Sequence, residues 1–158
     1  MPKLRQSVYL CYLFCLAIWM GSGFHDTIST NLGWYNDPIA FIRTKIDHPL
    51  PGSINTWVIS TLLLAVANIS AMLTFVKYRG KGSREILISV TGTLMMLAIT
   101  FLYFVPTLMR IFSSPPSYDN IAFISMSRQW IVLNFVRLIL VMILFIVGLT
   151  GLMKLARQ

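Results

Sequence analysis

The chain is poor in charged residues, which excludes a soluble fold. Only 11% of its 158 residues are Asp, Glu, Lys or Arg, whereas 56% are hydrophobic. Soluble domains carry about a quarter charged residues, so this chain has too few to cover a water-exposed surface. Its apolar residues also form long blocks, which indicates that lipid is the solvent for much of the chain.

Metal ligands and catalytic motifs are equally scarce. The two histidines, His25 and His48, form no H-x-x-x-H pair, which argues against a haem or metal site. Cys11 and Cys15 lack the C-x-x-C spacing of redox pairs, so we interpret them as small apolar packing residues. The chain also lacks G-x-S-x-G, P-loop and G-x-G-x-x-G motifs. The sequence therefore predicts a site without a metal or a bound cofactor.

Four long apolar blocks predict an all-α, integral membrane four-helix bundle in a single domain that spans the whole chain. The helices are expected at about residues 7–23, 54–77, 85–110 and 130–155. Ser53 and Ser83 are candidate N-caps, and Pro106 is expected to kink or end the third helix near Phe104. Residues 121–130 are compatible with a backward extension of the fourth helix. The first block lacks an A-x-A-like cleavage site, so we expect an uncleaved helix.

The net charge of +8 is distributed unevenly along the chain. Eight Lys and Arg residues lie in the N-terminal tail, the connection after the second helix and the C-terminal tail, whereas four lie on the opposite side. Because basic residues concentrate on the cytoplasmic side, both termini are predicted inside and the long loop at 24–53 outside. The bases form no stripe with interleaved aromatics, so nucleic acid is not an expected partner. Membrane lipids are expected partners, and homo-oligomers are left open.

Arg137 is a charge deep inside the fourth apolar block. A charged side chain at this depth costs a few kcal/mol to insert, so it is a functional candidate by default. Trp130, Asn134 and Arg137 are spaced i, i+4, i+7 and share one helix face. This face should point into the bundle, because an arginine that faces lipid has no partner.

Polar residues gather at the outward ends of the predicted helices, whereas the inner halves are almost purely apolar. This asymmetry predicts a polar pocket in the outer leaflet that opens to the outside. The expected catalytic residues are Arg137, which would stabilise an oxyanion, and His25 or Asp26, which would remove a proton. The expected substrate-binding residues are Trp57, Tyr103, Arg110, Trp130 and Asn134.

These residues also have structural interpretations. A purely structural role for Arg137, in which it pairs with Asp26 or with helix-end carbonyls, is as strongly expected as a role in ligand binding. A non-catalytic binding or assembly protein is therefore the alternative to an enzyme. A transporter is less favoured, since the inner halves offer few polar residues beyond Ser70, Thr74 and Thr91.

Several short motifs resemble those of one family. They are Gly21 and Gly23 followed by His25–Asp26, then Tyr103 with Pro106, then Trp130 with Asn134 and Arg137. Together they resemble the small four-span membrane family that includes the anthrone oxygenases and many bacterial proteins of unknown function. Many bacterial members carry an aromatic–Glu pair in place of His25–Asp26.

The resemblance implies four antiparallel helices in a bacterial-type inner membrane. It also implies oxidation of an aromatic, polyketide-like substrate without metal or flavin. We therefore expect a small oxygenase- or oxidoreductase-like enzyme that acts on a lipophilic aromatic or quinone-like molecule.

Overall fold

The computed structural model describes residues 2–28, 32–40, 53–77, 82–113 and 121–157, and these contain no strand. Their elements are α1 (Pro2–Asp26), α2 (Leu32–Asn36), α4 (Ser53–Lys77), α5 (Ser83–Ile99), η2 (Thr100–Phe104), α6 (Val105–Ser113) and α7 (Ile121–Ala156). The element η2 is a single π-helical turn that joins α5 to α6 in one continuous rod.

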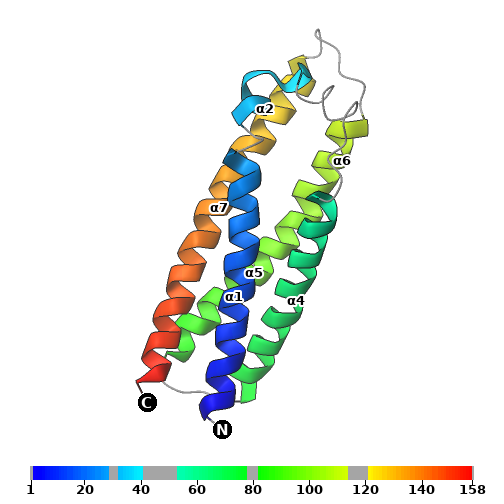
Figure 1. The fold of residues 1–158 in the computed structure, drawn as a ribbon. Helices are drawn as coiled ribbons and strands as arrows, with labels where there is room; N and C mark the ends of the chain where they lie inside the picture. The colour runs from blue at the N-terminus through cyan, green and yellow to red at the C-terminus, as the bar shows by residue number, and fades with distance from the viewer. Residues whose placement is uncertain (1, 29–31, 41–52, 78–81, 114–120, 158) are drawn as a thin grey trace.

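Four helical rods run side by side, with both termini at the same end of the bundle (Figure 1). α1 packs against α4 and α7, and α5 packs against the same two neighbours. All four rods are long and apolar enough to cross a membrane. The predicted four-helix membrane bundle is therefore confirmed, and the protein is an integral, multi-pass membrane protein.

Two rods are longer than the sequence predicts. α1 begins at Pro2 rather than near residue 7, so the first span is not short. α7 begins at Ile121 rather than near residue 130, which confirms the backward extension. The extension is stabilised because Phe123 is buried in one apolar cluster with Trp34 of α2.

The predicted N-cap of α5 is wrong. Gly82 occupies the cap position with a φ of 79°, and no side chain caps the helix. Glycine is required there because the left-handed conformation strains other residues. A Cβ atom would also overlap the carbonyl oxygen of Gly151 on α7. The side chain of Ser53, the other candidate cap, lies outside the described residues.

Pro106 does not end the third rod, which continues to Ser113. The π-helical turn lies directly before this proline. A proline in a helix lacks an N–H and crowds the preceding turn, and the wider π turn relieves that crowding. The turn also changes the rotation of the side chains along the rod, so it sets which of them face α7.

The inner half of the bundle holds a hydrogen-bonded core that the sequence analysis misses, since that half is expected to be almost purely apolar. The Tyr12 hydroxyl lies 2.9 Å from both Ser89 Oγ and Thr93 Oγ1. Ser89 donates to the carbonyl oxygen of Leu144 at 2.8 Å. Tyr12 therefore donates to Ser89 and accepts from Thr93, and this chain links α1, α5 and α7.

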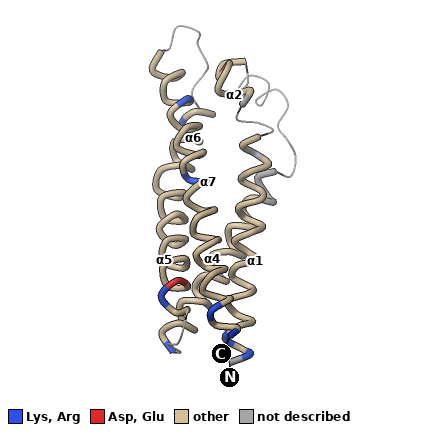
Figure 2. The backbone as a smooth tube through the Cα atoms, turned by 90° about the vertical axis from the view of Figure 1, so that its left-hand side faces the viewer, with Lys and Arg blue, Asp and Glu red and all other residues tan. Residues whose placement is uncertain are grey.

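Lys and Arg gather at the end that holds the two termini (Figure 2). The described basic residues in that region are Lys3, Arg5, Lys77, Arg84, Lys154 and Arg157. Lys154 forms an ion pair with Glu85 there, which ties α7 to the start of α5. The side of the membrane on which this end lies stays a prediction, based on the excess of positive charge.

Candidate functional site

Arg137 lies in the half of the bundle that is farther from the two termini, on the face of α7 that meets η2. It is 17 residues from Lys154, which corresponds to about 25 Å along an α-helix. If Lys154 marks one interface of a hydrocarbon layer about 30 Å thick, Arg137 lies just inside the other interface. The guanidinium is half-buried between the rods rather than exposed to lipid.

Three side chains fix the position of the Arg137 guanidinium. Its Nη1 donates to Thr100 Oγ1 at 3.1 Å. The Thr100 hydroxyl itself donates to the carbonyl oxygen of Met96 at 2.7 Å, so its lone pairs are turned toward the arginine. The guanidinium carbon lies 4.7 Å from the ring centroid of Phe104 and 5.4 Å from that of Trp19, within the range of cation–π attraction.

The Trp19 ring is held in place from a third helix. Its indole N–H donates to Thr61 Oγ1 at 3.0 Å, and Thr61 donates to the carbonyl oxygen of Trp57 at 2.8 Å. These bonds connect α1 to α4 at the level of the arginine. The aromatic wall on this side of Arg137 is therefore part of a rigid frame.

The hydrogen-bonding capacity of Arg137 is only partly used. Its Nε is buried and makes no hydrogen bond. Among the side chains that the structure describes, no carboxylate forms an ion pair with Arg137. The ion pair found among them joins Lys154 to Glu85. The Asp26 side chain, which was predicted as a partner, lies outside the described residues. A partly buried cation with an unpaired N–H is costly, and an acceptor supplied by a ligand would lower that cost.

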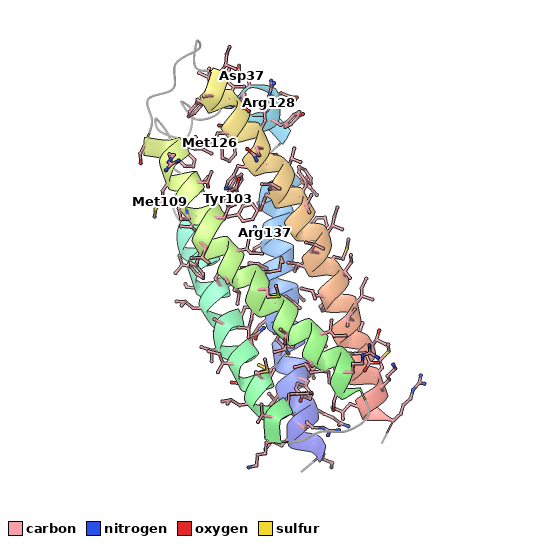
Figure 3. The ribbon with its side chains drawn as sticks, turned by 180° about the vertical axis from the view of Figure 1, so that it is seen from behind. Asp37, Tyr103, Met109, Met126, Arg128 and Arg137 are labelled. Atoms are coloured by element: carbon pink, nitrogen blue, oxygen red, sulfur yellow. The ribbon has the colours of Figure 1, made fainter. Side chains whose placement is uncertain are left out.

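A cavity of about 230 Å³ lies beside Arg137, between the α5–η2 segment and α7. Tyr103 and Arg137 both lie between these rods (Figure 3). Apart from these two residues the walls are apolar. The lining residues are Met96, Ile99, Tyr103, Phe104, Leu133, Val136, Arg137 and Leu140. We call this cavity the α5–α7 groove.

The α5–α7 groove opens on the side of the bundle. Three of its wall residues, Ile99, Val136 and Leu140, are 40%, 47% and 42% exposed. They lie on the outer surface of membrane-spanning rods, where the surrounding medium is hydrocarbon. The groove therefore faces the lipid.

An aromatic cluster fills the bundle above the groove. The Trp130 ring lies 5.1 Å from Trp34 and 5.8 Å from Phe104, measured between centroids. Ile111 and Phe123 are buried in the same cluster. The sequence analysis expects a polar pocket open to the outside, but apolar rings occupy that route and the described cavity opens sideways.

The predicted site residues divide into two groups. Tyr103 and Arg137 line the groove. Trp130 and Asn134 lie close by but have protein partners, because Trp130 donates to the Phe104 carbonyl at 3.0 Å and Asn134 Nδ2 donates to Thr27 Oγ1 at 3.3 Å. Asn134 Oδ1 is buried without a hydrogen-bond partner.

Like Trp130 and Asn134, three further predicted residues do not line the groove. His25 is exposed at the end of α1, and Arg110 is exposed on α6. Trp57 packs against Phe101 at 6.4 Å between ring centroids, on α4. Sequence reasoning places these residues at the right depth but not on the right face, because it has no information on helix rotation.

No family model, curated protein or solved structure matches the chain. The resemblance to the anthrone-oxygenase family therefore stays a prediction. Within the described residues, no three His, Cys, Asp or Glu side chains come together in a group that could hold a metal ion.

Three residues of the site are missed or undervalued by sequence reasoning. Trp19 carries no sequence signal beyond its depth in the first helix. Phe104 looks like an interfacial aromatic, and Thr100 looks like one polar residue among several. The signal that could find them is Arg137 itself, since a cation inside a bundle needs acceptors and aromatic faces at its own depth.

Proposed function

We propose that the protein binds a lipophilic aromatic or quinone-like molecule in the α5–α7 groove and acts on it as an oxygenase- or oxidoreductase-like enzyme. The observation that carries this proposal is Arg137, which has unused donors and no described carboxylate partner, beside an apolar cavity. Such a site favours a ligand that is mostly apolar and presents one oxygen to the arginine.

The walls of the groove support the proposal that the ligand contains an aromatic or quinone ring. Tyr103 and Phe104 contribute aromatic rings, which pack edge to face at 5.3 Å between centroids. Flat ligands pack well against such rings. The remaining walls are aliphatic and tolerate a range of ring substituents.

Arg137 would supply the electrostatic part of the chemistry. A guanidinium that is held by Thr100 and flanked by two rings is preorganised to stabilise negative charge on a phenolate or enolate oxygen. The Tyr103 hydroxyl is the other polar group in the groove and would hydrogen-bond the same or a second oxygen. The earlier assignment of His25 as a base receives no support, since this residue does not line the groove.

Oxygenase-like chemistry and a bacterial-type inner membrane are proposed from the resemblance of the motifs to the anthrone-oxygenase family. Binding without turnover is the second candidate. This second candidate is favoured because His25 lies outside the groove. The described residues that line the groove therefore include no histidine or carboxylate that could remove a proton.

The proposal is tested by binding of duroquinone to the protein in lipid nanodiscs, followed through quenching of tryptophan emission. Arg137→Leu should weaken binding by about tenfold or more, since it removes the charged donor to the ligand oxygen. Arg128→Leu is the matched control, because Arg128 is an exposed arginine on the same helix and lies outside the groove. Equal affinities for the wild type and Arg137→Leu would contradict the proposal. Binding without any consumption of quinone or quinol would favour the second candidate.

A further inference from the structure

The mouth of the α5–α7 groove is made of residues that belong to the lipid-facing surface. Ile99 lies on one wall, and Val136 and Leu140 lie on the other. All three are exposed, and each lies in a rod that is long and apolar enough to span the membrane. A molecule in the groove is therefore in direct contact with the hydrocarbon of the bilayer.

Among the described residues, a packed aromatic cluster lies between Arg137 and the end of the bundle opposite the termini. Above Arg137, the Trp130 ring packs edge to face against Phe104 and at a tilt against Trp34, and its N–H donates to the Phe104 carbonyl at 3.0 Å. Ile111 is fully buried in the same cluster. Entry from that end would require the packed cluster to open, whereas the side entrance is already present.

The size of the groove limits what it can enclose. Sites that bury an entire drug-sized molecule have volumes of about 300–1,000 Å³, and the groove measures about 230 Å³. It has room for one substituted ring beside Arg137. A long chain attached to that ring would have to leave through the mouth.

Building on the proposed function, we infer that the ligand is an amphiphile that enters the groove sideways from the lipid. Its oxygen-bearing ring lies against Arg137, and its alkyl or isoprenoid chain stays in the bilayer between α5 and α7. The substrate class is thus a membrane-resident quinone or phenol with a tail, rather than a water-soluble aromatic compound.

The test compares two probes with the same ring, dimethoxy-methyl-benzoquinone without a tail and decylubiquinone with one, in nanodiscs that contain the whole protein. Affinities are expressed per mole fraction of quinone in the lipid. The tail is surrounded by lipid both before and after binding, so it adds little to the affinity. The two affinities should therefore agree within about threefold on this scale. A difference of more than about tenfold would overturn the inference, since it would mean that the protein encloses or rejects the tail.

The entrance is tested by narrowing it. Val136→Phe combined with Ile99→Phe should weaken both probes by about tenfold, because the added rings occupy part of the space at the mouth that the ligand needs. Ile139→Phe is the matched control, since Ile139 is 53% exposed on the same helix at similar depth and does not line the groove. If the double variant unfolds, Leu140→Phe alone replaces it, and melting curves identify which variants are folded.

The outcomes separate the two proposals. Loss of binding in Arg137→Leu together with wild-type affinity in the narrowed variant would overturn sideways entry while leaving the proposed function standing. Wild-type affinity in Arg137→Leu would overturn the proposed function itself. Loss of binding in both variants, with the Ile139→Phe control unchanged, is the result expected.

Discussion

Trp130 on α7 donates its indole N–H to the carbonyl oxygen of Phe104, the last residue of the π-helical turn, at 3.0 Å. Seven residues further along α7, Arg137 donates to Thr100, the first residue of that turn. The two bonds hold the π turn against α7 at both of its ends. The ring of Phe104 lies between them and contacts both donors. The wider turn before Pro106 is thus part of the candidate site rather than a separate irregularity.

Replacement of Trp130 by phenylalanine tests the outer of these two bonds. Trp130→Phe keeps a ring in the aromatic cluster but removes the donor to the Phe104 carbonyl. We expect the free energy of unfolding to fall by about 1 kcal/mol, the usual contribution of a hydrogen bond between membrane helices. Unfolding in mixed micelles measures the change. Trp57→Phe is the control, since among the described residues the indole of half-buried Trp57 makes a ring contact with Phe101 and no hydrogen bond. A larger loss in the control would contradict this prediction.

The inner bond is tested at Thr100. Thr100→Val preserves the shape of the side chain but leaves Arg137 Nη1 without its acceptor, whereas Thr100→Ser keeps a hydroxyl. Because the charged guanidinium loses the acceptor of its hydrogen bond, Thr100→Val should lower the free energy of unfolding by about 1–3 kcal/mol. Thr100→Ser should lie closer to the wild type. If the two variants were equally stable, the hydrogen bond would not be the feature that holds Arg137.

The sequence predicts the bundle well because its signals are long and additive. Each apolar block is long enough to cross a bilayer, although the first reaches only the lower limit, and in lipid a helix satisfies the backbone of such a block. Length and composition do not fix the ends of the helices, however. The start of α7 at Ile121 depends on the burial of Phe123 against α2, a contact between distant segments.

The candidate site is predicted only in part, for a related reason. Arg137 is found from sequence because a charge in an apolar block is conspicuous. The face that each helix turns toward it depends on helix rotation and on the π turn, neither of which has a local signal. His25 and Trp57 are therefore assigned to the site by depth alone, whereas Trp19 is overlooked. The hydrogen bonds of Tyr12 with Ser89 and Thr93 are overlooked for the same reason.

The orientation in the membrane is open to a direct test. Cys11 and Cys15 are first replaced by alanine, and single cysteines are then introduced at Lys3 and Arg128, which lie at opposite ends of the bundle. If the basic end is cytoplasmic, a membrane-impermeant maleimide added to intact cells should label the Arg128→Cys variant and not the Lys3→Cys variant. After permeabilisation both should react. The reverse pattern in intact cells would show that the termini lie outside.

The close crossing of α5 and α7 at the inner end gives the sharpest stability prediction. A Cβ atom on Gly148 would lie 2.6 Å from Ser89 Oγ and 2.8 Å from Leu13 Cδ2. Gly148→Ala must therefore displace the side chains of Ser89 and Leu13 and disturb the Ser89 bond to Leu144, and we expect a loss of about 1–3 kcal/mol in the free energy of unfolding.

Gly21 provides the matched control for this change. It lies in α1 with no atom within 4 Å of the position that a Cβ would take. Gly21→Ala should therefore raise the free energy of unfolding by up to about 1 kcal/mol, because alanine favours the helix more than glycine does. Opposite signs for the two glycine-to-alanine changes, measured by unfolding in the same mixed micelles, are the expected result. Equal effects would mean that the α5–α7 contact is looser than the structure shows.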